Sequence, residues 1–538
     1  MACTGGDGVG PTRMKNWSPP TRGLLFLVLT CVVVGGGLAA LQPAPSSIGW
    51  LGSASLLLLG LTVLFAVWRW SGGGKTIAWM IGLAVGLRLA AGVATYVALP
   101  LNGYDVPDDK AGYVFTDAHR RDDQAWELAK SGKSLLAAFD KTFYTDQYGG
   151  LLGLSALTYR VFSPDEHRPL IIVLLAAMTA AAGIPFFYKA ARLLWNERLA
   201  SIAAWVAVLY PESILTGGAQ MREPFLLTFL ALTLWGFARW SQKGARAGWL
   251  WMGGGVAGML LVSPAISVAA LVLLGCWLWS RGEHRRLPWQ IIAAASAAML
   301  IGILFLAWSV SRPHDFSGGS PIGIILNWIR GSVKWVIFEL ERGSGQIQNV
   351  FSKMNPLAQF LFVVGYGIAQ PVLPPAFLEP TTLTWHIIAV LRALGWYTLL
   401  PLLLYAPLAA WRTPPGSERR TWMWLTAFSW SWILVCAIRA GGDQWDNPRY
   451  RLIFLGIQAL AAGYAWLSWR ERKDAWLPRI LGLEILCTLV FGQWYLARYY
   501  LIGIHFPILV VLAISLSCVA LIMLGGWLWD RIRGRRQA

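Results

Sequence analysis

Long apolar runs recur along almost the whole of this 538-residue chain, and they constrain its fold more than any other feature. Runs of about 20 apolar residues are typical of transmembrane helices. Inside a bilayer the backbone polar groups must be satisfied within such helices. Only 13% of the residues are charged, whereas soluble domains carry about 25%. The sequence therefore predicts an all-α polytopic membrane protein with about fourteen transmembrane helices. We place these spans near residues 24–41, 48–68, 77–99, 168–188, 199–216, 224–238, 249–263, 265–280, 289–309, 385–411, 421–439, 450–469, 476–496 and 503–529.

Basic residues cluster in alternate short loops between these spans, as with Lys189 and Arg192 or Arg281 and Arg285. The positive-inside rule makes those loops cytoplasmic. We therefore expect a multi-pass protein of the cell membrane with both termini in the cytoplasm. This orientation requires the proline-broken apolar run 357–377 to be re-entrant or interfacial. The net charge of +18 then reflects orientation and contact with anionic lipid headgroups, and nucleic acid is not an expected partner.

Two long external regions follow from this topology, at about 100–167 and 310–384. In the first region we expect a short helix from Asp122 to Lys133 and a second, apolar helix from Tyr148 to Phe162. In the second region, residues 322–342 form an amphipathic pattern that suits a helix in the headgroup layer. None of the six Cys lies in an external region and no CxxC motif occurs, so we expect neither a disulfide framework nor a zinc site.

The first external region is unusually acidic, because it holds eleven of the 27 acidic residues. Asp117, Asp122 and Asp123 lie within seven positions of one another, beside Arg120 and Arg121. A carboxylate just above the membrane could deprotonate an acceptor hydroxyl if burial or neighbours tune its pKa, and the arginines could hold a phosphate. The alternative is a solvated helix start, where Asp is favoured by the helix dipole. We treat these three aspartates as candidate catalytic bases.

Further candidates lie at the same external face. Arg222 and Glu223 lie at a short external turn between two spans. Arg449 and Arg451 lie at the start of the span 450–469, on the external side, where the positive-inside rule predicts few basic residues. We expect Arg222, Arg449 and Arg451 to bind a lipid phosphate; the alternatives are an ion-paired turn for Arg222 and arginine snorkelling to the interface for Arg449 and Arg451.

Four residues are candidates for substrate binding. Asp146 and Tyr148 combine a carboxylate with an aromatic face, a pairing that also suits sugars, although a polar loop over the bilayer explains it as well. Glu223 lies beside Arg222 at the turn. Arg88 lies near the middle of the span at 77–99, where an unpaired arginine costs several kcal/mol, so we expect it to face the bundle interior or a polar cavity.

The order of these segments resembles the GT-C superfamily of integral-membrane glycosyltransferases, the group that contains protein O-mannosyltransferases and aminoarabinose transferases. The resemblance rests on Leu87-Arg88, on the loop with Asp117 and Asp122-Asp123-Gln124-Ala125-Trp126, on Tyr148-Gly149-Gly150, on Tyr210-Pro211-Glu212 with Arg222-Glu223, and on Pro448-Arg449-Tyr450-Arg451. It covers about residues 77–470. We therefore divide the chain into two extra N-terminal helices (1–76), a catalytic module (77–470) and C-terminal helices with a basic tail (471–538).

The resemblance implies a sugar donor on polyprenyl phosphate and transfer at the extracytoplasmic face. It also implies an essential acidic residue in the first external loop, best matched by Asp117 and Asp122. The Asp-Glu dipeptide of the mannosyltransferase branch is replaced here by Asp122-Asp123. The acceptor could be a glycan, a lipid or a protein.

A polyprenyl phosphate is a good leaving group, so one carboxylate base and positive groups on the phosphate would suffice for an inverting displacement. No residue spacing indicates a metal site, although the aspartates could hold a divalent cation. The alternatives to an enzyme are a secondary transporter or lipid-linked-glycan flippase and a non-catalytic scaffold.

Overall fold

The computed structural model describes residues 19–43, 45–143, 145–243, 247–281, 289–311, 320–342 and 351–537, and within these ranges it forms helices and loops without a strand. The predicted all-α membrane fold is confirmed. Nine of the described helices are long and apolar enough to cross a membrane, or up to eleven crossings if each of two bent helix pairs counts as one. The predicted count of fourteen is not confirmed, although a helix is present at each of the fourteen predicted positions.

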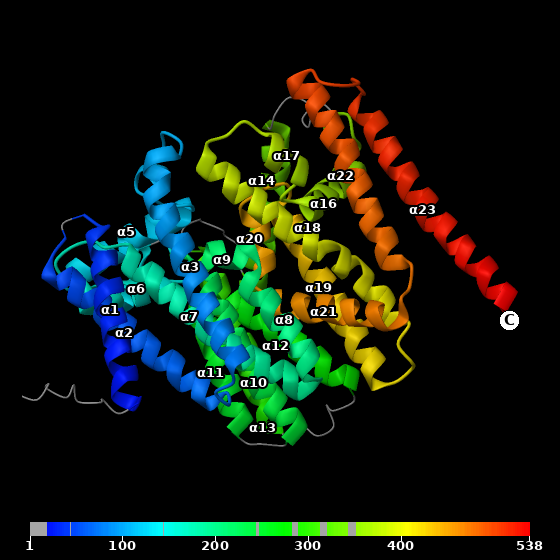
Figure 1. The fold of residues 1–538 in the computed structure, drawn as a ribbon. Helices are drawn as coiled ribbons and strands as arrows, with labels where there is room; N and C mark the ends of the chain where they lie inside the picture. Colours follow the sequence, from blue (N-terminus) through cyan, green and yellow to red (C-terminus); the bar gives the residue numbers. More distant parts are fainter. Residues whose placement is uncertain are drawn as a thin grey trace, which may run out of the picture.

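The helices of the membrane body form a bundle, and the two external regions interrupt them in the chain after α3 and after α13 (Figure 1). In chain order they are α1 (Pro19–Ala40), α2 (Ser47–Trp70), α3 (Lys75–Asn102), α7 (Leu170–Leu194), α8 (Glu197–Leu209), α9 (Pro211–Gly217), α10 (Glu223–Lys243), α11 (Ala247–Val262), α12 (Pro264–Arg281), α13 (Trp289–Ser311), α18 (Leu383–Trp411), α19 (Ser417–Ala440), α20 (Asp446–Leu452), α21 (Leu455–Arg472), α22 (Trp476–Tyr500) and α23 (Ile508–Gln537).

The core of the bundle lies around α7, the most deeply buried of the candidate spans. Its small residues let neighbouring backbones come close, as is usual for helices in membranes. At Gly183, for example, an added Cβ would lie 2.9 Å from the Cα of Thr228 on α10. At the two ends of the chain, α1 packs on α2 and α22 on α23, and Figure 1 shows these pairs on opposite sides of the molecule.

Two bent pairs interrupt the regular bundle and carry functional candidates. The α8–α9 pair bends by 55° and the α20–α21 pair by 76°. Pro211 begins α9, and a proline at the first turn of a helix needs no backbone N–H partner. The turn after α9 packs closely on α3: an added Cβ at Gly92 would lie 2.4 Å from the carbonyl oxygen of Gly218. The bends therefore bring the Arg222 turn and Arg449 into the region beside the first external loop.

The first external loop folds into short helices, namely α4 (Pro107–Lys110), α5 (Thr116–Lys130), η1 (Leu135–Phe139), η2 (Lys141–Phe143) and α6 (Gly150–Phe162). The predicted helix at 148–162 is confirmed by α6. The predicted helix at 122–133 is confirmed in part, because α5 begins six residues earlier, at Thr116. Its buried face includes Arg121 and Asp122 among Ala118, Ala125 and Leu128, and these charges hide the apolar periodicity in the sequence.

The second external region contains α14 (Pro321–Arg342), α16 (Pro356–Ala369) and α17 (Leu373–Leu378). The predicted amphipathic helix is present as α14. At 14 residues, α16 is about 21 Å long, which is shorter than the roughly 30 Å hydrocarbon core. This agrees with the prediction that the run 357–377 does not span the membrane.

Candidate active site

Six charged side chains from four parts of the chain meet beside the first external loop, and we call them the charged cluster. Its members are Asp117 and Arg121 on α5, Asp146 before α6, Arg222 and Glu223 at the start of α10, and Arg449 on α20. Five of the six were predicted as site residues. Their segments lie up to 332 positions apart in the chain, so tertiary structure alone assembles them.

The first contact of the charged cluster joins Asp117 to Arg449. Asp117 lies in the first turn of α5, and an oxygen of its carboxylate accepts a hydrogen bond of 3.3 Å from Nη2 of Arg449. The Asp117 side chain is 54% exposed, whereas that of Arg449 is 4% exposed. Arg449 also contacts Asp446 at 2.8 Å and Glu223 at 3.5 Å. A buried arginine surrounded by three carboxylates thus holds an accessible Asp117 in place.

The electrostatic surroundings keep Asp117 ionised. Burial raises the pKa of its carboxyl, but the positive charges of Arg449, Arg121 and Arg222 lower it by more, so the pKa lies below its ordinary value. Arg449 contacts the Asp117 carboxylate directly, and the charges of Arg121 and Arg222 act on it from a greater distance. A carboxylate of this kind can accept a hydrogen bond from a hydroxyl at neutral pH.

Asp146 and Arg121 link α5 to the start of α6. Asp146 is fully buried, and one of its oxygens accepts hydrogen bonds of 3.1 Å from the backbone N–H groups of Leu151 and Leu152. Negative charge is favoured at the N-terminal end of a helix, which is where Asp146 lies relative to α6. The other oxygen lies 3.8 Å from Nε of Arg121, whose Nη1 donates to the carbonyl oxygen of Gln220 at 3.0 Å. Asp146 and Arg121 thereby fix α5 against the turn that carries Arg222.

Arg222 is the member of the charged cluster whose guanidinium is available to a ligand. It lies over the ring of Tyr148, 5.0 Å from the ring centroid. Within the described ranges it makes no ion pair and no side-chain hydrogen bond. Burial lowers the pKa of Arg222, but the negative charge of Asp146, then Tyr148 and Glu223, raises it by more. Arg222 therefore remains positively charged without being neutralised by direct contact.

Asp122 and Asp123 lie outside the charged cluster. Asp122 is buried and accepts hydrogen bonds from Tyr113 at 2.7 Å, from Tyr159 at 2.7 Å and from His167 at 2.9 Å. These donors occupy both carboxylate oxygens and tie α5 to α6 and to the segment before α7. Asp123 is 52% exposed and lies near two histidines, His119 at 3.4 Å and His167 at 3.9 Å. Of the three predicted bases, Asp117 is the one that the fold places among the arginines.

The contact between His167 and Asp122 predicts a pH-dependent stability. Burial lowers the pKa of His167, but the hydrogen bond and charge of Asp122 raise it by more, to above its ordinary value. Protonated His167 therefore stabilises the fold below about pH 6.5, and this contribution is lost as the pH rises through the higher folded-state pKa. We expect the melting temperature of the wild type to fall by about 2 °C more between pH 6 and pH 9 than that of His167→Gln. The matched control is His505→Gln, at an exposed loop position, and a control that flattens the profile equally would contradict the assignment.

Arg451 lies apart from the charged cluster. Its guanidinium stacks on Trp396 at 3.6 Å from the ring centroid and donates to the backbone carbonyls of Ile368, at 3.2 Å, and Gln370. These carbonyls belong to the end of α16. Arg451 thus connects α20 to the end of α16. The geometry gives no support for its predicted contact with a lipid phosphate.

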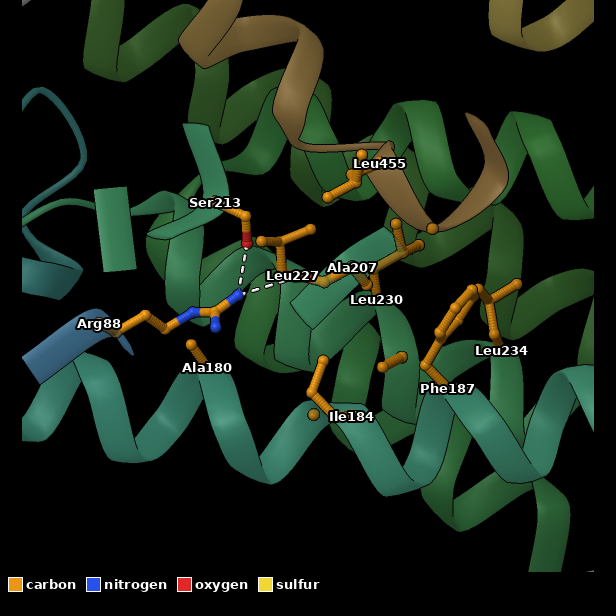
Figure 2. Close-up of a pocket in the computed structure, with 13 residues that line it drawn as sticks. Arg88, Ala180, Ile184, Phe187, Ala207, Ser213, Leu227, Leu230, Leu234 and Leu455 are labelled. Atoms are coloured by element: carbon orange, nitrogen blue, oxygen red, sulfur yellow. Dashed lines mark hydrogen bonds between the residues drawn. The ribbon is translucent and has the colours of Figure 1, made fainter. Parts of the chain in front are cut away.

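Arg88 fastens α3 to the bend between α8 and α9 (Figure 2). Its guanidinium donates to the carbonyl oxygens of Ala207, at 3.0 Å, and Val208, at 3.3 Å, and to the hydroxyl of Ser213 at 2.6 Å. The bend would otherwise leave these carbonyls without partners. The guanidinium lies at the edge of an apolar cavity of about 40 Å³. Arg88 therefore supports the bend that orients α9, and its hydrogen bonds go to Ala84, Ala207, Val208 and Ser213 rather than to the charged cluster.

Several site residues were missed or only partly recognised in the sequence. Arg121 lies four positions after Asp117 and hence on the same helix face, a spacing that could have placed it in the cluster. Asp446 lies three positions before Arg449 in the same way. The buried pair of Glu212 with Arg392, at 2.5 Å, had no local signal because its members are 180 positions apart.

No group of three or more His, Cys, Asp or Glu side chains in the described ranges has an arrangement that could hold a metal ion. The carboxylates of the charged cluster contact arginines instead. The divalent cation considered above stays a prediction without structural support.

Comparison with solved structures gives matches at low sequence identity. The fold is similar to that of an archaeal oligosaccharyltransferase. The structure of AglB from Archaeoglobus fulgidus, in complex with an inhibitory peptide and a dolichol-phosphate, matches with a TM-score of 0.36 and 16% identity over 83% of this chain and 55% of that one. The apo form of the Archaeoglobus fulgidus oligosaccharyltransferase matches with a TM-score of 0.38 and 14% identity over 84% of this chain and 55% of that one.

Both matched structures are of an oligosaccharyltransferase, in keeping with the predicted resemblance to membrane glycosyltransferases. The chain spans about half the length of the two solved structures. No protein-family description matches the sequence, and no curated protein matches it. Because the TM-scores are low, these matches give no information about the site residues. The proposed function therefore depends on the charged cluster of this chain.

Proposed function

We propose that this chain is a membrane glycosyltransferase that moves a sugar from a polyprenyl-phosphate donor to an acceptor hydroxyl at the extracytoplasmic face. The observation that carries the proposal is the pairing of an accessible, ionised carboxylate with an uncompensated arginine. Asp117 is 54% exposed, and Arg222 is close enough to lower the pKa of Asp117. A base and a phosphate-binding cation are the two groups that such a transfer needs.

Arg222 is the proposed phosphate ligand. A guanidinium binds phosphate oxygens in a bidentate manner, and among the described residues Arg222 has no carboxylate partner to displace. Arg449 differs, because three carboxylates already contact it. In this proposal Arg449 orients Asp117 and adds positive charge near the phosphate.

The remaining polar atoms of the charged cluster suit the hydroxyls of a sugar. Asp146 and Glu223 each have one buried carboxylate oxygen without a hydrogen-bond partner in the described ranges, and Arg121 and Arg449 each have such an Nε. Hydroxyl groups both donate and accept, so they match a site that offers both kinds of atom. Because these atoms are buried, a sugar reaches them only if the site opens on binding, so the substrate-binding roles of Asp146 and Glu223 stay predictions, with Tyr148 as the aromatic face beneath Arg222.

The proposed reaction is a single in-line displacement. Asp117 accepts the proton of the acceptor hydroxyl, and the acceptor oxygen uses its electron pair to form a bond to the anomeric carbon. The bond between that carbon and the phosphate oxygen breaks, and the polyprenyl phosphate leaves with the bonding electrons, stabilised by Arg222. Attack opposite to the leaving group inverts the anomeric centre.

The transporter alternative depends on charge at the membrane midplane. Arg88, the strongest sequence candidate for such a charge, is bound to backbone carbonyls and to Ser213. Its contacts favour a structural role, so the glycosyltransferase is the preferred function.

The direct test is to incubate the purified full chain with a panel of radiolabelled polyprenyl-phosphate sugars and candidate acceptors in lipid nanodiscs. We expect one donor to transfer label to an acceptor and to release unlabelled polyprenyl phosphate in equal amount. Movement of intact labelled donor across the bilayer of proteoliposomes, without release of polyprenyl phosphate, would favour the flippase instead.

Arg222→Gln is expected to weaken the use of the donor. A hydrogen bond to a charged group contributes about 1.5–3 kcal/mol, so kcat/KM for the donor should fall by about 10- to 100-fold, through both KM and kcat, because Arg222 binds the donor and also stabilises the leaving phosphate. Arg120→Gln is the matched control, since Arg120 is an exposed α5 arginine that loses the same charge outside the charged cluster. Equal donor kinetics of Arg222→Gln and the control would exclude the phosphate contact.

A further inference from the structure

A second cationic site lies between α12 and α19, which pack against each other. The site is a cavity of about 730 Å³, lined by Ser280 at the end of α12, by residues that precede α19 and by its first turns. The residues that line it are Ser280, Pro415, Gly416, Arg419, Arg420, Met423, Trp424 and Ala427.

The cavity and the charged cluster are at opposite ends of α19. Arg419 and Arg420 are in its first turn, whereas α20 with Arg449 follows its last residue, Ala440. A helix of 24 residues is about 36 Å long, which is more than the thickness of the hydrocarbon core. Both α12 and α19 are candidate spans, so the cavity lies at the other membrane surface, which the basic loops predict to be cytoplasmic.

Among the described residues, the two arginines at this cavity have no side-chain partner. In the part of the chain that the structure describes, neither Arg419 nor Arg420 makes an ion pair or a side-chain hydrogen bond. Arg412, at the end of the preceding helix, differs because Asp474 neutralises it. No described residue therefore compensates the positive charge of the cavity.

The polarity of the cavity changes with depth. Arg420, Met423 and Ala427 are spaced by three and four residues and hence share one face of α19. This face is charged at the membrane surface and apolar one and two turns further in. The ring of Trp424 borders this face, and its Nε1 donates a hydrogen bond of 3.3 Å to the carbonyl oxygen of Leu273. A negatively charged headgroup with an acyl chain matches this gradient, whereas a free phosphate ion matches only its outer part.

We infer that the cavity between α12 and α19 binds one anionic phospholipid, with its phosphate at Arg419 and Arg420 and an acyl chain along Met423 and Ala427. Basic pockets between membrane helices suit such headgroups, and cytoplasmic leaflets are rich in them. The site is independent of the proposed glycosyl transfer, because it lies at the far end of α19 and needs no sugar substrate.

The test uses the purified full chain and native mass spectrometry in detergent, titrated with phosphatidylglycerol or phosphatidylcholine. We expect phosphatidylglycerol to form a first adduct more tightly than phosphatidylcholine. In Arg419→Gln/Arg420→Gln this adduct should weaken by about 20-fold. Ala427→Trp should weaken it to a similar extent without a change in charge, because the exposed Ala427 would be replaced by a ring that fills the path of the acyl chain.

The matched control is Arg470→Gln/Lys473→Gln, which removes the same charge near the end of α21 and outside the cavity. We expect it to retain the first adduct. The inference is overturned if this control loses the adduct equally, if Ala427→Trp retains it, if both lipids bind alike, or if inorganic phosphate displaces phosphatidylglycerol. Melting temperatures of all variants in detergent without added lipid separate loss of binding from loss of folding.

Discussion

Asp117→Asn is expected to lower kcat by about 10²- to 10⁴-fold, the usual contribution of a general base. The substitution keeps the shape of the side chain but removes its ability to accept a proton. It leaves Arg222 and Tyr148 unchanged, so the KM for the donor should change much less than kcat. Initial rates of sugar transfer with the donor identified in the panel experiment would measure both parameters.

Two neighbouring substitutions serve as controls for Asp117→Asn. Asp123→Asn alters an exposed carboxylate near His119 and His167, and we expect nearly normal kcat. Asp122→Asn alters a buried acceptor of three side-chain hydrogen bonds, so it should lower stability rather than act selectively on kcat. Normal transfer by Asp117→Asn, or a large loss of kcat in folded Asp123→Asn, would exclude Asp117 as the base.

The pH dependence provides a further check on Asp117. A base acts only when it is deprotonated, so activity is lost as the pH falls through its pKa. The pKa of Asp117 is lowered from its ordinary value by Arg449, Arg121 and Arg222, which together outweigh burial. The loss of activity that protonation of Asp117 causes should therefore occur below about pH 4. A loss of activity on acidification that occurs at higher pH must come from another group.

Arg392→Met is expected to be the most destabilising of the substitutions considered. Arg392 on α18 and Glu212 on α9 form a buried bidentate pair, with contacts of 2.5 and 3.1 Å. Removing one member leaves the other charge buried and unpaired, which costs about 3–5 kcal/mol. The guanidinium also stacks on Trp445, 4.3 Å from its ring centroid. We expect a large fall in the unfolding midpoint in a denaturant titration in detergent.

The double variant Glu212→Gln/Arg392→Met distinguishes an unpaired charge from a lost contact. Because it removes both charges of this buried pair, it should recover much of the stability lost in Arg392→Met. Arg412→Met is the matched control, since its partner Asp474 lies in a more exposed pair, and exposed pairs contribute about 0–1 kcal/mol. A double variant as unstable as Arg392→Met would show that packing on Trp445, rather than charge, dominates.

Local sequence patterns predicted the segments of the site but not its contacts. Asp117 was recognised from the acidity of its loop, yet it could not be separated from Asp122 and Asp123. The separation comes from the turn of α5, which directs Asp122 toward Tyr113, Tyr159 and His167. Arg449 and Arg451 were equivalent in the sequence, two positions apart on a short helix. Only the packing of α16 gives Arg451 backbone carbonyls as partners while Arg449 faces the carboxylates.

The sequence by itself determined the membrane-spanning helical class of this protein, because a bilayer leaves long apolar segments no stable form other than a helix. It also determined the position of most helices and the concentration of acid in the first external loop. Only the tertiary structure decided which charges meet, because Asp117, Arg222 and Arg449 come from segments with no periodic relation to one another. Their meeting depends on the bends at α8–α9 and α20–α21 and on close backbone contacts such as Gly92 with Gly218, which arise from the packing of the whole bundle.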